Sequence, residues 1–311
     1  MMVILAYYFF TTIEDPQQEV AKHRAFLEGK DIRCRVYISH EGINGQMSAS
    51  EKDGEAYIAW LKSDERFSEI AFKTHFHPVH VFPRTTVKYR KQLVALDQAV
   101  DFSQRGSYIT PREFRKALEE KKEDLLILDV RNRYEWEIGH FEGAELLPFE
   151  NFRDFPLYAQ KLQKERDVEA TRVLMYCTGG IRCELFSPLL RKAGFRNVYQ
   201  LQGGVIQYGL DEGSAHWRGK LFVFDDRLSV SIDTKKEAEV ISRCTFCQKF
   251  SDLYYNCANV ECNELFLSCL YCAEERTGCC STECQQAPRV RAFKKEARPV
   301  PFRRLCETCG S

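Results

Sequence analysis

Residues 176–183 have the sequence Tyr176-Cys177-Thr178-Gly179-Gly180-Ile181-Arg182-Cys183. An apolar run, residues 172–176, precedes the cysteine, and a helical pattern over residues 184–193 follows it and ends at Gly194. A strand–turn–helix unit of this kind aims successive backbone N–H groups and a helix N-terminus at one atom. A thiolate is stabilised there relative to a thiol, so we expect Cys177 to ionise near neutral pH and to act as a nucleophile.

The spacing within this segment also limits the chemistry. Gly179 and Gly180 lack a Cβ and permit a tight turn. The predicted cradle consists of the backbone amides of Thr178, Gly179, Gly180 and Ile181. Arg182 adds a fixed positive charge at the rim, so Cys177 and Arg182 are the candidate catalytic residues. The six-residue loop from Cys177 to Arg182 suits a sulfur-sized terminal atom. Cysteine-dependent phosphatases use a loop one residue longer, which disfavours phosphatase activity.

Three short apolar runs occur around this segment, at residues 125–130, 172–176 and 198–201. Continuous apolar runs of this length are typical of buried parallel strands. Helix-like segments lie between them, and this alternation predicts a parallel α/β sheet. We therefore expect an α/β domain over residues 121–215.

Further motifs in this domain are shared with a known family. Besides the cysteine loop, they are Asp129-Val130-Arg131, residues 134–144 and residues 201–205. In this order they resemble the rhodanese family, which implies that Cys177 can carry a persulfide. We expect Asp129 and Arg131 to hold the fold together, and His140 to pack. Cys183 is either a small residue in the first helical turn or a resolving thiol.

The first 95 residues alternate strand and helix patterns in a different order. We expect strands at residues 3–13, 32–39 and 71–76, a short strand after residues 42–45, and helices that begin near Pro16 and Ser50. The order βαββαβ predicts a ferredoxin-like α+β domain over residues 1–95. Residues 80–106 show no clear periodicity, and residues 96–120 are expected to connect the two domains.

Composition and charge limit the class of protein. The chain has 311 residues, with 45 basic and 45 acidic side chains, so it presents no strong overall field to nucleic acid. Any basic footprint must therefore be local. No stretch approaches the ~18 apolar residues of a membrane span. The apolar run at residues 3–10 lacks a basic leader and a cleavage site. We interpret it as a strand and expect a cytoplasmic protein with no membrane partner.

The cysteines are concentrated in one region. Of 14 cysteines, eleven lie between Cys244 and Cys309, which in a cytosolic chain favours a metal site over disulfides. Four thiolates for zinc can come from Cys244, Cys247, Cys269 and Cys272. A second site could use Cys257, Cys262, Cys279, Cys280 and Cys284. We expect a small, metal-stapled region over residues 216–311 with structural zinc. An iron–sulfur cluster or redox-active thiols are the alternatives, and Cys306 and Cys309 have no assigned role.

The flanks of the central domain carry a second resemblance. The matching segments are residues 41–45, 177–184 and 219–227 and the cysteine array at residues 244–284. From end to end the chain resembles the rhodanese-domain tRNA wobble-uridine hydroxylases. This resemblance implies an oxygen-dependent conversion of uridine to 5-hydroxyuridine, with molecular oxygen as co-substrate. The chain has no Gly-x-Gly-x-x-Gly fingerprint, and we expect neither flavin nor haem. His75, His77 and His80 have no nearby carboxylate, so we do not expect an iron site there.

The implied partner is the anticodon loop of a tRNA; no protein partner can be inferred. A base that leaves its stack needs aromatic side chains for stacking and cations for phosphates. Two basic segments are candidate tRNA contacts, although charge runs are usually solvated faces. They are Arg84, Lys88, Arg90 and Lys91, and Arg289, Arg291, Lys294 and Lys295.

A mechanism follows from pyrimidine chemistry. Uracil C6 is electrophilic, so a Cys177 thiolate or persulfide that adds there makes C5 enolate-like and able to react with oxygen. The amide cradle and Arg182 would stabilise the developing charge.

Two rival hypotheses remain. One is a sulfurtransferase that passes persulfide sulfur from Cys177 to an acceptor, with Cys183 as resolving thiol. The other is a non-catalytic, zinc-stapled RNA-binding module.

Overall fold

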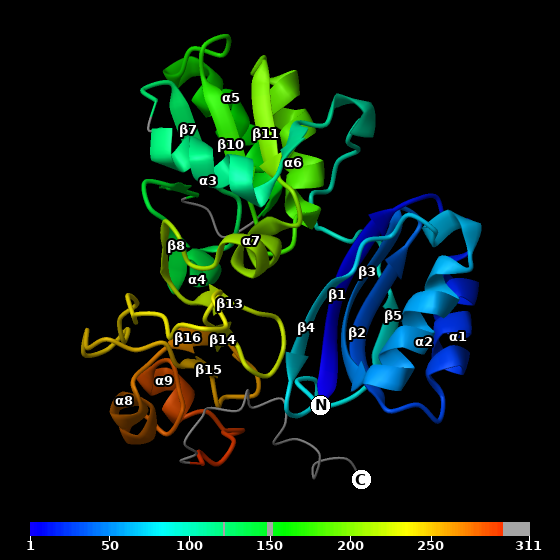
Figure 1. The fold of residues 1–311 in the computed structure, drawn as a ribbon. Helices are drawn as coiled ribbons and strands as arrows, with labels where there is room; N and C mark the ends of the chain where they lie inside the picture. The colour runs from blue at the N-terminus through cyan, green and yellow to red at the C-terminus, as the bar shows by residue number, and fades with distance from the viewer. Residues whose placement is uncertain (121, 148–151, 295–311) are drawn as a thin grey trace.

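The computed structural model describes residues 1–120, 122–147 and 152–294. It contains an N-terminal domain built on one sheet, a central domain built on a second sheet, and a C-terminal region with two clusters of cysteines (Figure 1). This arrangement confirms the fold class predicted from the sequence.

The N-terminal domain is a sheet covered by helices on one face. Its elements are β1 (Met2–Phe10), α1 (Pro16–Leu27), β2 (Ile32–Ser39), β3 (Gly42–Ser50), α2 (Glu51–Lys62), the 3₁₀ turn η1 (Glu65–Phe67), β4 (Lys73–His77) and β5 (Thr86–Tyr89), in the sheet order β4-β1-β3-β2-β5. The first four strands pair antiparallel, as the ferredoxin-like prediction requires.

Successive side chains along these strands point to opposite sides, so the sheet has two different faces. Leu5 and Tyr7 of β1 pack in the core formed with α1 and α2. Ala6 and Tyr8, on the same strand, point to the opposite face and line a cavity. We call this second side the open face; in Figure 1 it is turned towards the central domain and away from α1 and α2.

Several short strands were not predicted, and two of them, β5 and β6, extend the two large sheets. Each has only three or four residues and takes its stability from a neighbour. β5 pairs in parallel with β2, within residues that show no strand periodicity. β6 (Ser107–Ile109) pairs with the central sheet, and α3 (Pro111–Glu120) contacts the central helix α7 (Gly204–Glu212). The central structural unit thus reaches into the predicted connector at residues 96–120.

The central domain has the predicted parallel sheet, with strand order β6-β11-β10-β7-β9. The strand pairs of this sheet are parallel. The elements after β6 and α3 are β7 (Leu125–Asp129), α4 (Arg133–Trp136), β8 (Gly139–Phe141), β9 (Glu145–Leu146), η3 (Phe152–Asp154), α5 (Phe155–Glu165), β10 (Arg172–Tyr176), α6 (Ile181–Lys192), β11 (Asn197–Leu201) and α7. Since parallel strands end at one edge, the loop after β10 lies where the ends of β7 and β11 also converge.

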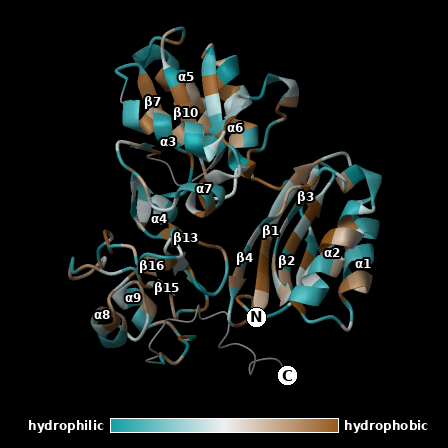
Figure 2. Ribbon diagram, in the orientation of Figure 1, coloured by the Kyte–Doolittle hydropathy of each residue, from teal (hydrophilic) through white to brown (hydrophobic). Residues whose placement is uncertain are grey.

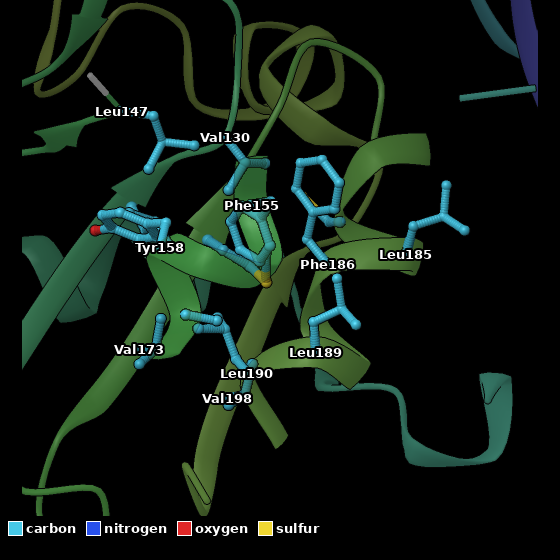
Figure 3. Close-up of a cluster of buried hydrophobic side chains, with 14 of the residues drawn as sticks. Val130, Leu147, Phe155, Tyr158, Val173, Leu185, Phe186, Leu189, Leu190 and Val198 are labelled. Carbon is cyan, nitrogen blue, oxygen red and sulfur yellow. The ribbon is translucent and has the colours of Figure 1, made fainter. Parts of the chain in front are cut away.

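Helices α5 and α6 cover one face of this sheet. Phe155 and Phe186 stack with ring centroids 4.1 Å apart, and Figure 3 shows them among Val130, Leu190 and other apolar side chains. In Figure 2 the strands of both sheets are largely hydrophobic, whereas α1 and α3 carry hydrophilic stretches on their outer sides. Cys177 and Cys183 belong to this same packed cluster, so the loop is anchored in the core.

The C-terminal region consists of short elements between turns. They are β12 (Trp217–Gly219), β13 (Leu221–Phe222), β14 (Ser229–Val230), β15 (Tyr254–Asn256), β16 (Leu265–Leu267), α8 (Leu270–Glu275) and α9 (Thr282–Gln285). β12 pairs with β8, which joins this region to the central domain. None of the helices in the described ranges has the length and apolar content needed to cross a membrane.

The stacked pair in the central core gives a stability prediction. Phe155→Ala removes a fully buried ring and should lower the free energy of unfolding by about 3–5 kcal/mol. Leu157→Ala, on the same helix but 67% exposed, should change it by less than about 0.5 kcal/mol. Urea denaturation followed by fluorescence measures both. Equal effects would contradict the packing described here.

Candidate active site

The Cys177 sulfur lies at the turn between β10 and α6 and is fully buried. The backbone N–H of Gly180 donates a hydrogen bond to it at 3.1 Å. The amides of Arg182 and Cys183 also act on the sulfur. Gly180 has φ +103°, a left-handed conformation that favours glycine and aims its amide inward. The turn therefore presents backbone dipoles to one sulfur atom. Of the four predicted amides, that of Gly180 makes this contact, and the amides of Arg182 and Cys183 were not predicted.

Burial and hydrogen bonding act in opposite directions on this thiol. Burial raises the pKa of Cys177, whereas the Cys183 thiol, the charge of Arg182 and the backbone amides lower it. The balance brings its pKa down to about 5. Burial, together with the neighbouring Cys177, raises the pKa of Cys183 well above its usual range. Cys183 therefore stays a thiol that donates to the thiolate, a role that its sequence position did not reveal.

Arg182 lies inside the protein rather than at the rim where the sequence placed it. It is 5% exposed and forms a bidentate ion pair with Glu135 of α4, with N···O distances of 2.6 and 2.7 Å. Thr178 donates a further hydrogen bond to Glu135 at 2.9 Å. Glu135 lies within the motif at residues 134–144, but no pattern in the sequence indicates that its carboxylate pairs with Arg182. The pair fixes the loop and offsets most of the Arg182 charge.

The first turn of α7 holds the same loop from the other side. The N–H groups of Val205 and Ile206 donate to the carbonyls of Cys177 and Thr178 at 3.0 and 3.1 Å. A Cβ on Gly204 would meet the Cys177 carbonyl oxygen at 2.5 Å, so only glycine allows this approach. This contact explains the Gly203-Gly204-Val205 segment in physical terms.

The open face of the N-terminal sheet forms the opposite wall of a cavity of about 340 Å³. The central domain contributes Thr178, Gly179, Ile181 and Arg182 to its lining. The N-terminal domain contributes Tyr8, Arg35, Tyr37, Asn44, Gln46 and Lys73. The site is thus a composite of two domains and combines aromatic rings, cations and amides next to the loop that carries the buried thiolate.

Glu184 ties these two domains together beside the cavity. This carboxylate is 2% exposed and accepts hydrogen bonds from Tyr8 at 2.9 Å and Tyr108 at 2.7 Å. Arg105 binds its other oxygen at 3.1 Å. Because Tyr8 comes from β1, the N-terminal sheet is held against the first turn of α6.

The other candidate residues of the central domain have structural partners. Arg131 and Asp129 are fully buried and form an ion pair at 2.6 Å. Arg131 also donates to the carbonyl of Gly139, and His140 contacts the Trp136 carbonyl at 2.8 Å. These contacts agree with the packing roles expected from the sequence.

Two clusters of four cysteines have the geometry of a metal site. They are Cys244, Cys247, Cys269 and Cys272, and Cys257, Cys262, Cys280 and Cys284. Within each cluster all sulfurs lie within 4.8 Å of one another, and the sulfur pairs Cys247–Cys269, Cys262–Cys280 and Cys280–Cys284 are 3.6–3.8 Å apart. A tetrahedron with Zn–S bonds of about 2.3 Å places its sulfurs ~3.8 Å apart. Cys279, a candidate for the second site, is buried outside that cluster. Cys306 and Cys309 lie outside the described residues.

The histidines that suggested iron do not converge. His75 contacts Arg227, His77 contacts the Val79 carbonyl, and His80 contacts Ser48 and Asp31. Within the described residues only the cysteine clusters form groups suited to a metal ion.

The first basic segment lies near the cavity. Lys88 pairs in register with Tyr37, which lines the cavity, and the Arg90 guanidinium lies 4.9 Å from the Tyr37 ring centroid. Arg84 and Lys91 are exposed at either end of β5.

The second basic segment belongs to the C-terminal region. Arg289 pairs with Glu261, and Arg291 donates to Cys257 and Asn263. Lys294 is exposed, and Lys295 lies outside the described residues.

Comparison with known proteins agrees with this organisation. Residues 2–93 match the UPF0176 acylphosphatase like domain, residues 110–209 the Rhodanese-like domain, and residues 218–285 the Rhodanase C-terminal model. Among solved structures, a rhodanese-like domain from Anabaena sp matches 36% of this chain and 78% of its own, at 24% identity and a TM-score of 0.30. The three family models define a rhodanese-like domain with a domain on either side of it.

Full-length relatives identify the family. The tRNA uridine(34) hydroxylase of Protochlamydia amoebophila is 54% identical over 301 residues, which cover 97% of this chain and 93% of that protein. The proteins of the same name from Chlamydia felis and Chlamydia trachomatis serovar D are each 53% identical, cover 97% and 98% of this chain, and are themselves covered to 94% and 93%. The chain belongs to the tRNA uridine(34) hydroxylase family.

The buried ion pair beneath the loop can be tested directly. Glu135→Gln leaves the Arg182 charge without its partner and should lower the free energy of unfolding by about 3–5 kcal/mol. Glu137→Gln breaks an exposed pair with Arg133 on the same helix and should cost less than about 1 kcal/mol. Chemical denaturation of both variants measures the difference. A Glu135→Gln protein as stable as the wild type would contradict the role given to this pair.

Proposed function

We propose that this protein hydroxylates C5 of the wobble uridine of tRNA, with molecular oxygen as co-substrate and the Cys177 sulfur as the group that activates the base. The single observation that carries the chemistry is a stabilised thiolate beneath a cavity lined by aromatic and cationic side chains. Family membership supports the substrate and the product. A tRNA substrate also favours the cytoplasmic location expected from the sequence.

The cavity has the features that an extruded base needs. Tyr8, Tyr37 and Tyr134 supply rings, and Asn44 and Gln46 supply amides that can bind the polar edge of uracil. Its volume of about 340 Å³ is at the small end of ligand sites, which suits a single nucleotide. Arg35 places a permanent cation in the same wall, where a phosphate of the anticodon loop can approach.

Activation of the base follows from the sulfur. The Cys177 thiolate, or the outer sulfur of a Cys177 persulfide, adds to C6 of uracil, and the C5–C6 electron pair moves towards C5 and O4. Oxygen then reacts at C5; one oxygen atom stays on the base, and the other leaves as water with two electrons from an external reductant. Departure of the sulfur from C6, with loss of the C5 proton, restores the double bond.

The tRNA is proposed to enter along the open face of the N-terminal sheet. Lys88 and Arg90 lie next to Tyr37 on this side, so they extend the positive lining of the cavity outwards. We assign them, with Arg84 and Lys91, to phosphate contacts. The residues from Arg289 to Lys295 remain candidates for more distant contacts.

Zinc is proposed as the structural metal of both cysteine clusters, because four thiolates at these spacings match its tetrahedral preference. The clusters do not line the cavity. They stabilise the region that supports it, where the Tyr254 hydroxyl donates to the Tyr134 carbonyl and Phe222 packs on the Tyr134 ring.

The activity can be tested in cells and with purified protein. Cys177→Ala should abolish formation of 5-hydroxyuridine in tRNA, because it removes the reacting sulfur. Mass spectrometry of tRNA nucleosides from a deletion strain that carries each variant measures this. Cys34→Ala, a buried cysteine in the N-terminal core, is the matched control and should leave the product present.

The same experiment separates the rival hypotheses. Wild-type levels of 5-hydroxyuridine in the Cys177→Ala strain would contradict the proposal and would favour a non-catalytic RNA-binding module. Loss of a sulfur-containing nucleoside, with 5-hydroxyuridine unchanged, would indicate a sulfurtransferase instead.

Metal analysis tests the proposed zinc sites. The purified protein should contain two zinc ions per chain, one for each cluster. Cys244→Ser should retain only the second zinc, whereas Cys279→Ala should keep both because its sulfur is not a ligand. A brown protein rich in iron, or one without metal, would contradict this assignment.

A further inference from the structure

Lys73 is a buried cation that the mechanism above does not use. It is the first residue of β4 and lies opposite Ala6 of β1, on the open face of the N-terminal sheet. The side chain is 8% exposed and lines the cavity above the cysteine loop. Within the described ranges the contact of its ammonium group is the Tyr8 ring, whose centroid is 5.2 Å away, and no carboxylate forms an ion pair with it. Burial of an unpaired ammonium group is costly, so such a lysine is a candidate for function.

Lys73 and the Cys177 thiolate carry opposite charges beside the cavity. Arg182 is paired with Glu135, and Arg105 is paired with Glu184. When these two pairs are set aside, the positive charge of Lys73, which lines the cavity, and the negative charge of Cys177 in the loop beside it attract each other. Burial lowers the pKa of Lys73 to about 8, while the charges of Cys177 and Glu184 act to raise it. The group is therefore a cation at neutral pH and loses its charge as the pH rises through about 8.

Arg35 is the other cation of the wall without a carboxylate partner, but it has a different position. It lies on β2 and donates to the Phe224 carbonyl at 2.9 Å. Lys73 lies on the far side of β1 in the sheet order and interacts electrostatically with Cys177. The two cations thus lie on strands that β1 and β3 separate, and Lys73 is the one for which an interaction with the sulfur is established.

The negative charge must move when the sulfur reacts. As the bond from Cys177 to C6 forms, the C5–C6 electron pair shifts through C4, and the negative charge leaves the sulfur for O4. A cation that faces both the thiolate and the bound base stabilises the second arrangement without any movement of the protein. The flexible four-carbon stem of lysine also lets its ammonium group follow the charge.

We infer that Lys73 is a catalytic residue, which donates a hydrogen bond to O4 of the bound uracil and stabilises the enolate formed when Cys177 adds to C6. This inference rests on the proposed function and adds the residue that recognises the reacting base. It assigns Lys73 to the base and Arg35 to the phosphate.

A trapping experiment tests the inference without the oxidation step. An anticodon stem-loop RNA with 5-fluorouridine at the wobble position is incubated with the full-length protein in the absence of oxygen. Fluorine makes C6 more electrophilic, so the wild type should form a covalent adduct at Cys177 that survives denaturing electrophoresis. Lys73→Met should form this adduct about a hundredfold more slowly, the usual effect of removing one oxyanion donor. Lys62→Met, an exposed lysine on α2, is the control and should match the wild type.

A second readout separates catalysis from simple support of the thiolate. The alkylation rate of Cys177 by iodoacetamide is measured in the same variants. We expect Lys73→Met to slow adduct formation much more than alkylation. The wild-type adduct rate should fall above pH of about 8, whereas Lys73→Arg, which keeps its charge, should retain part of the rate and show no such fall. An unchanged adduct rate in Lys73→Met, an equal loss in both reactions, or no adduct in the wild type would each overturn the inference.

Failure of this inference differs from failure of the proposed function. In parallel, the wild type and Lys73→Met are given unmodified tRNA with oxygen and a reductant, and 5-hydroxyuridine is measured. Product from both proteins at equal rates overturns only the role of Lys73. No product from the wild type, under conditions in which cells make it, contradicts the proposed function itself.

Discussion

A negative charge on a fully buried sulfur is the constraint on which the rest of this structure depends. Burial alone would keep Cys177 protonated. The Gly180 amide, the Cys183 thiol and the Arg182 charge reverse that preference, and each requires its own support. Glu135 fixes Arg182 from α4, and the first turn of α7 fixes the loop carbonyls. These contacts of the central domain thus hold one ionised sulfur atom in place.

The central domain alone does not form the whole site. The turn supplies the sulfur and its dipoles, whereas the open face of the N-terminal sheet supplies Tyr8, Arg35, Tyr37 and Lys73. The buried Glu184 joins the two parts through hydrogen bonds to the hydroxyls of Tyr8 and Tyr108. The C-terminal region adds Phe224 to the cavity and packs against Tyr134. All three regions of the chain therefore contribute to one small cavity.

The sequence predicted those features that depend on neighbours along the chain. The thiolate turn follows from the residues at 176–183, and the alternation of strands and helices predicted both sheets. β5 and β6 were missed because short edge strands are defined by their partners. Glu135 lies 47 residues from Arg182, and Lys73 lies in another domain, so neither contact leaves a local pattern. Cysteine spacing found both clusters, but only the positions of the sulfur atoms in the fold show that Cys280, and not the adjacent Cys279, belongs to the second.

The central claim is that Cys177 is a thiolate at neutral pH, and the pH dependence of its alkylation tests this most directly. Iodoacetamide reacts with the thiolate, so the rate rises as pH increases through the pKa of the thiol. Mass spectrometry of the peptide that contains Cys177 separates it from the other cysteines. The account predicts a midpoint near the pKa of about 5 and a constant rate above neutral pH. A rate that still rises between about pH 8 and pH 9, as for an ordinary thiol, would contradict it.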